Sequence, residues 1–108
     1  MLIAKQKPLH WTYHAKAKMR QYGLSEQRVR RILHTPKRIE EGIAPKTIAL
    51  MQSSGSPKHP HELWVMIVEE KARRKIISAW RYPGVTKERS KEALDILSRE
   101  FSDYEEHQ

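Results

Sequence analysis

The longest apolar runs of the chain lie in its second half, on either side of a short charged connection. Residues 63–68 and 76–80 are rich in β-branched and aromatic side chains, and the connection at 71–74 reads Lys-Ala-Arg-Arg. This pattern is typical of an antiparallel hairpin. Because apolar residues occupy consecutive positions in both runs, we predict that both faces of each strand are covered and that the hairpin lies inside a sheet.

Apolar residues at helical spacing predict two short helices before this hairpin. The first extends from residue 11 or 12 to residue 21 or 22, with Thr12 as its N-cap and Gly23 as its C-cap. The second follows the N-cap Ser25 and ends at residue 34, because Pro36 cannot continue a helix. The expected core positions of the two helices are Trp11, Ala15, Met19, Tyr22, Val29, Ile32 and Leu33.

Three further segments are expected between and after these elements. Residues 37–41 and 46–52 are interpreted as strands joined by a turn at 42–45, and the Ser-, Pro- and Gly-rich segment 53–61 as a mobile loop. A C-terminal helix is expected beyond the N-cap Thr86. Its predicted buried stripe consists of Ala93, Leu94, Leu97 and Phe101.

The order helix, helix, four strands, helix predicts one α+β domain spanning residues 1–108. Its helices pack on a four-stranded, mainly antiparallel sheet. Residues 1–9 show no periodicity and are interpreted as an extended arm, and residues 102–108 as a frayed tail.

Charge divides the chain into a basic front and an acidic end. The 108 residues carry a formal net charge of +8, and residues 1–38 hold ten Lys and Arg against one acid. Residues 88–108 hold seven acids against three Lys and Arg. A basic front of this kind favours RNA or DNA as the ligand. The alternative is that these side chains are only solvated helix surface.

Several classes of protein do not fit the composition. The chain has no cysteine and no apolar run of the roughly 20 residues that span a bilayer. It has no Gly-rich phosphate loop and no nucleophile elbow. His34, His59 and His61 lack a cysteine or a carboxylate at ligand spacing. We therefore expect a cytoplasmic protein with no membrane association, no metal and no cofactor.

Residues 14–25 read His-Ala-Lys-Ala-Lys-Met-Arg-Gln-Tyr-Gly-Leu-Ser. This segment resembles the motif His-Ala-x-x-Arg-Met-x-x-x-Gly-Ile-Ser of a family of small, largely uncharacterised prokaryotic domains allied to the BrnT and RelE/ParE toxins. The similarity continues through the second predicted helix and ends with the strand at 76–82. Lys18 stands where the family has Arg, which replaces a bidentate phosphate fork with a point charge. Leu24 replaces Ile conservatively. The resemblance implies a compact α+β fold.

The related toxins cleave RNA without a metal, so the resemblance implies attack of a ribose 2′-oxygen on the adjacent phosphate. This reaction needs a base, a cation for the phosphorane charge and an acid. His14 is expected to transfer protons, and Lys18 lies one helical turn away on the same face. Arg81 supplies a second cation if its strand end meets the first helix. The residues expected to contact nucleic acid are Arg20, Arg28, Arg30, Arg31, Lys75 and Tyr82.

Each of these residues also has a structural interpretation. His14 can pack the first helix against the sheet, Lys18 can be solvated, and Arg81 can pair with an acid of the last helix. Because side chains alternate along a strand, Arg81 is expected to face away from Trp80 and Tyr82.

Two functions of different class therefore remain open. The first is a metal-independent endoribonuclease of toxin-antitoxin type, held inactive by an antitoxin-like protein partner that covers the basic face. The second is a non-catalytic module that uses the same surface to bind RNA, DNA or a protein. The sequence leaves the oligomeric state undetermined.

Overall fold

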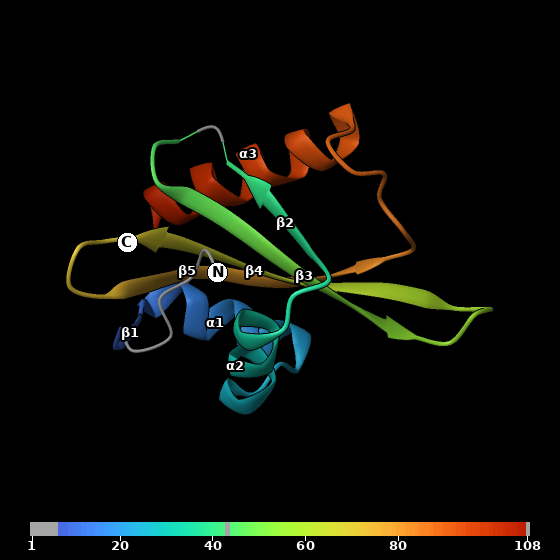
Figure 1. Ribbon diagram of the computed structural model, residues 1–108, viewed down its shortest axis with the longest axis horizontal. Coiled ribbons are helices and arrows are strands. Elements are labelled where there is room, and N and C mark those ends of the chain that lie inside the picture. Colours follow the sequence, from blue (N-terminus) through green and yellow to red (C-terminus); the bar gives the residue numbers. More distant parts are fainter. Residues whose placement is uncertain (1–6, 43, 108) are drawn as a thin grey trace.

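The computed structural model describes residues 7–42 and 44–107, which form three helices and five strands (Figure 1). In chain order the elements are β1 (Leu9–Trp11), α1 (Tyr13–Tyr22), α2 (Glu26–His34), β2 (Arg38–Glu41), β3 (Thr47–Gly55), β4 (Pro60–Glu69), β5 (Arg74–Pro83) and α3 (Lys91–Glu106). The predicted α+β class is confirmed. Residues 1–6 of the expected arm, Ile43 of the expected turn and Gln108 lie outside the described residues.

The five strands form one mixed sheet in the order β1-β5-β4-β3-β2. The expected four-stranded sheet is therefore wrong by one strand, because β1 pairs in parallel with β5 while the other pairs are antiparallel. Leu9 and Trp11 of β1 pack against the buried core, and the Thr12 amide donates to the Ile76 carbonyl at 3.2 Å. A strand of three residues is too short to show a period of two, so the sequence pattern could not reveal it.

The helices cover both faces of this sheet, an arrangement that the sequence did not predict, and three of its four strand pairs are antiparallel. Helices α1 and α2 lie on one face and α3 on the other (Figure 1). Along β4, Leu63, Val65 and Ile67 join the core beneath α1 and α2, whereas Trp64 and Met66 join the core beneath α3. The predicted burial of the hairpin on both faces is confirmed, because β4 and β5 are interior strands with a separate core on each side.

The ends of both N-terminal helices agree with the sequence prediction. The Thr12 hydroxyl accepts a hydrogen bond from the Ala15 amide at the start of α1. Gly23 ends α1 with φ of 67°, a left-handed conformation that favours glycine. Ser25 caps α2 by accepting from the Arg28 amide. The caps fix the short connection between α1 and α2, which lines the site described below.

The segment predicted as a mobile loop at 53–61 is mostly strand. Strand β3 runs to Gly55, which pairs with Pro60 at the start of β4. Ser56 and His59 exchange backbone hydrogen bonds of 3.2 and 3.1 Å across the turn. Serine, proline and glycine indicated a loop, but backbone pairing with β4 holds these residues in an extended ladder.

Helix α3 begins later and ends later than predicted. Its N-cap is Ser90, whose hydroxyl accepts from the Ala93 amide, and not Thr86. The buried Thr86 hydroxyl instead donates to Glu62 at 2.7 Å. The helix continues to Glu106, through most of the expected tail, and the buried Tyr104 packs into the core beneath it.

Candidate anion-binding site

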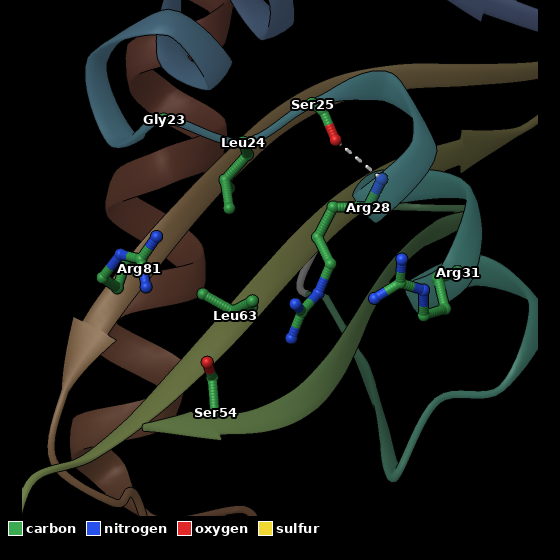
Figure 2. A pocket seen from close by; sticks show the side chains of 8 residues that line it. All are labelled: Gly23, Leu24, Ser25, Arg28, Arg31, Ser54, Leu63 and Arg81. Carbon is green, nitrogen blue, oxygen red and sulfur yellow. Dashed lines mark hydrogen bonds between the residues drawn. The ribbon is translucent and has the colours of Figure 1, made fainter. Parts of the chain in front are cut away.

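Three arginines surround an open pocket where the α1–α2 connection meets strands β3, β4 and β5 (Figure 2). Arg28 and Arg31 come from α2, and Arg81 comes from β5. The pocket has a volume of about 260 Å³. Its lining consists of Gly23, Leu24, Ser25, Arg28, Arg31, Ser54, Leu63 and Arg81.

Helix spacing and strand alternation bring these cations together. Arg28 and Arg31 are three residues apart, so they lie on neighbouring positions of one face of α2. Arg81 follows Ala79 by two residues on β5 and therefore lies on the same sheet face, the one covered by α1 and α2. One nitrogen of Arg81 donates to the Tyr22 carbonyl at 3.2 Å, which holds the guanidinium beside the end of α1.

The pocket carries three positive charges with no negative charge in its described lining. No Asp or Glu is among the lining residues, and no ion pair to a described residue is recorded for Arg28, Arg31 or Arg81. The Nε atom of Arg28 is buried and has no hydrogen-bond partner among the described residues. Leaving a buried donor without an acceptor costs about 1–3 kcal/mol. An anion bound in the pocket would supply that acceptor and reduce the repulsion between the guanidinium groups.

The basic site belongs to a part of the chain that is mainly basic. Residues 13–34, which include α1 and α2, hold six Lys and Arg and one acid, giving a net charge of +5. Helix α3 holds six acids and two Lys and Arg, giving a net charge of −4. Helices α1 and α2 lie on one face of the sheet and α3 on the other (Figure 1), and the two charged elements meet where Lys18 of α1 contacts Glu100 of α3.

The structure does not bring His14 and Lys18 to this pocket. Lys18 is partly buried and lies 3.3 Å from the Glu100 carboxylate of α3, which also accepts a 2.8 Å hydrogen bond from Ser78. The sequence suggested that Lys18 is either catalytic or solvated, and neither interpretation included this ion pair. Lys18 Nζ also lies 5.2 Å from the centre of the Tyr22 ring.

His14 is buried between α1 and the C-terminal end of α3. Its side chain is only 7% exposed, and its Nε2 atom lies 3.6 Å from an Asp103 carboxylate oxygen. Burial lowers the pKa of His14 below its ordinary value of 6.5, and this effect outweighs the opposing attraction of Asp103. Arg81 contacts the carbonyl of Tyr22, which follows His14 by eight residues on α1. His14 and Arg81 therefore lie about 12 Å apart along the helix axis.

Two other arginines expected to bind nucleic acid lie on the basic face but outside the pocket lining. Arg20 is exposed in the last turn of α1. Arg30 is exposed on α2, and its guanidinium lies 5.6 Å from the ring centre of Trp11. Both positions leave the charge available to a polyanion that crosses this face.

Lys75 and Tyr82 are placed away from the three arginines. Lys75 lies 3.4 Å from the Glu70 carboxylate near the β4–β5 turn. The Tyr82 hydroxyl donates to Glu92 on the α3 side of the sheet, and this hydrogen bond raises the pKa of Tyr82 above its ordinary value of 10.0. Tyr82 therefore faces away from Arg81, as strand alternation predicted.

The sequence did not indicate the uncharged part of the pocket. Ser54, whose hydroxyl points toward the hollow in Figure 2, falls in the segment that composition assigned to a mobile loop. Leu24 and Leu63 form an apolar part of the wall, but nothing in their sequence context distinguishes them from ordinary core leucines. Only the folded chain places these three residues beside the arginines.

Comparison of the chain with models of protein families, with curated proteins and with solved structures found no match in any of the three cases. None of the helices in the described part of the chain is long and apolar enough to span a membrane. The arginine pocket and the charge of the surrounding face are therefore the observations on which a function can be argued.

Proposed function

We propose that this protein is a nucleic-acid-binding module that docks a backbone phosphate of RNA between Arg28, Arg31 and Arg81. The observation that carries the proposal is that three arginines line one pocket without a carboxylate among the described lining residues. Guanidinium groups match the geometry of phosphate oxygens and donate paired hydrogen bonds to them. The unpartnered Nε of Arg28 is a donor of this kind.

The size of the pocket supports a small anionic group as the ligand. Its volume of about 260 Å³ is below the roughly 300–1,000 Å³ of typical small-molecule sites. A phosphate group fits such a hollow, while the rest of a larger ligand must extend over the surface. Leu24 and Leu63, which are 6% and 1% exposed, close the bottom of the hollow beneath the polar side chains.

The charge of the surrounding face supports a polymer over a free phosphate metabolite. Beyond the pocket, Arg20 and Arg30 are exposed on the same side of the fold, within a surface of net charge +5. A chain of phosphates gains from several such cations at once, whereas a single phosphate gains only from those in the pocket.

The test is binding of a fluorescently labelled single-stranded RNA, measured by anisotropy at fixed salt. Arg28→Ala and Arg81→Ala each remove a charged donor from the pocket, so we expect each to weaken binding about ten- to a hundredfold. The matched control is Arg99→Ala, because Arg99 is exposed on α3 on the opposite face. Equal RNA affinity in the unchanged protein and in all three variants would refute the arginine pocket as the phosphate site.

The nature of the ligand is tested with the same proteins. We expect single-stranded RNA to bind more tightly than inorganic phosphate, and phosphate to compete only at high concentration. DNA of the same sequence that binds better than RNA would identify a DNA-binding module. Saturation by phosphate alone, with no gain from an attached chain, would identify a receptor for a small anion.

Cleavage of the bound RNA is the second candidate function, and the position of Arg81 favours it. Arg81 lies in the pocket, where it can stabilise the charge that develops on an attacked phosphate. The expected products carry a 2′,3′-cyclic or 3′-phosphate and form in EDTA. Arg81→Ala should slow cleavage of bound RNA about 10²- to 10³-fold through loss of this charge stabilisation. His14 lies about 12 Å from Arg81 along the axis of α1, so His14→Ala should leave the cleavage rate unchanged. Intact RNA after prolonged incubation with the folded protein would leave binding as the function.

A further inference from the structure

A histidine, an aspartate and a second histidine meet where the start of α1 touches the end of α3. They are His14 of α1, Asp103 of α3 and His107, which caps the C-terminus of α3. One ligand atom from each residue lies within 4.8 Å of the others. The cluster is separate from the arginine pocket, whose lining contains none of the three residues.

The buried member of the cluster presents an atom that needs a partner. Only 7% of the His14 side chain is exposed, and its Nε2 atom has no hydrogen-bond partner among the described residues. The nearest carboxylate oxygen of Asp103 lies at 3.6 Å, which is too far for a hydrogen bond. A neutral imidazole with a free ring nitrogen is the form in which histidine binds a metal ion.

The other two members are arranged to complete such a site. Asp103 and His107 are four residues apart, so they occupy one face of α3 and point the same way. The imidazole rings of His14 and His107 stack with centres 6.0 Å apart. The Nδ1 atom of His107 donates to the Asp103 carbonyl at 2.8 Å, which leaves its Nε2 atom free for a metal ion. Lys18 is a positive charge near His14 and would repel a metal ion. Its ion pair with Glu100 reduces this repulsion.

We propose that His14, Asp103 and His107 bind one divalent transition-metal ion of the zinc type. Two imidazole nitrogens and one carboxylate form a donor set that suits zinc, whereas magnesium and calcium prefer oxygen ligands. Ligand atoms in a tetrahedral zinc site lie about 3.3 Å apart, given metal–ligand distances near 2.0 Å. The His14–Asp103 separation of 3.6 Å is already close to this value.

The two exposed ligands can move to bring all three ligand atoms within metal-binding distance of one another. Asp103 and His107 are 42% and 62% exposed, so their side chains can rotate toward the fixed nitrogen of His14. Three protein ligands leave the fourth tetrahedral position to water. The bound ion would connect the first turn of α1 to the last turn of α3 across the edge of the sheet, so metal binding would stabilise the contact between the two layers of helices.

The experiment uses the full chain without an affinity tag, stripped of metal with EDTA and exchanged into buffer. Titration with Zn²⁺ is followed by calorimetry, and titration with Co²⁺ by the visible absorption of a four-coordinate ion. We expect saturation at one ion per chain and a higher melting temperature with Zn²⁺. His107→Ala should weaken Zn²⁺ binding by at least about tenfold. Loss of a residue that only hydrogen-bonds to a metal ligand already lowers metal affinity about tenfold or more, and His107 is itself a proposed ligand.

Two controls make the result decisive. His59→Ala removes an exposed histidine from the His-Pro-His segment and should leave Zn²⁺ affinity unchanged. Mg²⁺ should not compete. The proposal fails if no Zn²⁺ binds, if His107→Ala binds Zn²⁺ as the unchanged chain does, or if His59→Ala abolishes binding. Because the test measures no nucleic acid, its outcome is independent of the proposed RNA site.

Discussion

Buried nitrogen atoms without partners mark both sites of this protein. The Nε atom of Arg28 borders the arginine pocket, and the Nε2 atom of His14 faces Asp103 and His107. A third such atom, Nε1 of Trp80, lies within the core beneath α3. Because an unsatisfied buried polar atom is costly, an anion beside Arg28 and a metal ion beside His14 would each supply a missing partner.

His14 makes a testable contribution to the pH dependence of stability. Burial holds its pKa in the folded protein below the 6.5 of the unfolded chain. The unfolded chain therefore binds the proton more readily, and stability is lost as the pH falls below about 6.5 toward the lower folded pKa. Above 6.5 both states are neutral at this residue, so its contribution is constant.

The measurement is the melting temperature between pH 8 and pH 5, in EDTA so that no metal occupies the residue. We expect His14→Gln to show a shallower loss between pH 6.5 and 5 than the unchanged protein. The same pH profile in both proteins would show that His14 is not the responsible group.

At the scale of elements, a buried carboxylate on β4 connects the sheet to the chain that leads into α3. Glu62 is 1% exposed and accepts hydrogen bonds from the Trp64 indole, the Thr86 amide and the Thr86 hydroxyl. Arg38 of β2 donates to Thr86 and lies 3.7 Å from Glu62. This network explains why Thr86 is unavailable as the N-cap of α3, which begins instead after Ser90.

Replacing this carboxylate should destabilise the fold strongly. Glu62→Ala leaves the donors of Trp64 and Thr86 unpaired and removes a charge beside Arg38, so we expect a loss of about 3 kcal/mol or more in the free energy of unfolding. Urea denaturation measures the change. The control Glu41→Ala alters an exposed position of β2 and should stay within about 0.5 kcal/mol. A loss for Glu62→Ala as small as the one expected for Glu41→Ala would show that the network contributes little to stability.

At the scale of the molecule, the sheet separates a basic layer from an acidic one. Helices α1 and α2 and their connection carry a net +5, and α3 carries a net −4. A polyanion is therefore attracted to one face and repelled from the other. The arginine pocket lies on the attractive face, so approach and docking are directed to the same surface.

This arrangement predicts a steep salt dependence of RNA binding. If about five phosphates are neutralised, the affinity falls roughly a hundredfold between 50 and 200 mM salt. Titrations at several salt concentrations measure the slope, and Arg31→Ser should reduce its magnitude by about 0.7 through loss of one phosphate contact. Affinity that does not change with salt would exclude the basic face as the phosphate-binding surface.

Local patterns in the sequence determined most of the secondary structure. Thr12, Gly23 and Ser25 fixed the ends of α1 and α2 because caps depend on a few neighbouring residues. The consecutive apolar positions at 63–68 and 76–80 indicated two strands buried on both faces, since only interior strands need apolar residues on both sides. The basic character of α1 and α2 also followed from the sequence alone.

Tertiary structure decided which of these residues meet. Arg28 and Arg31 are 50 or more positions from Arg81 in the chain, and no local pattern links them. The same holds for His14 and its neighbours Asp103 and His107, which the sequence assigned to a frayed tail. Strand β1 was missed because pairing with the distant strand β5, and not local preference, holds it extended. The adjoining ends of β3 and β4 were missed because loop-type residues such as Gly55 and Pro60 pair with each other across a short turn. Contacts between distant segments depend on how the whole sheet assembles, so both sites appear only in the folded chain.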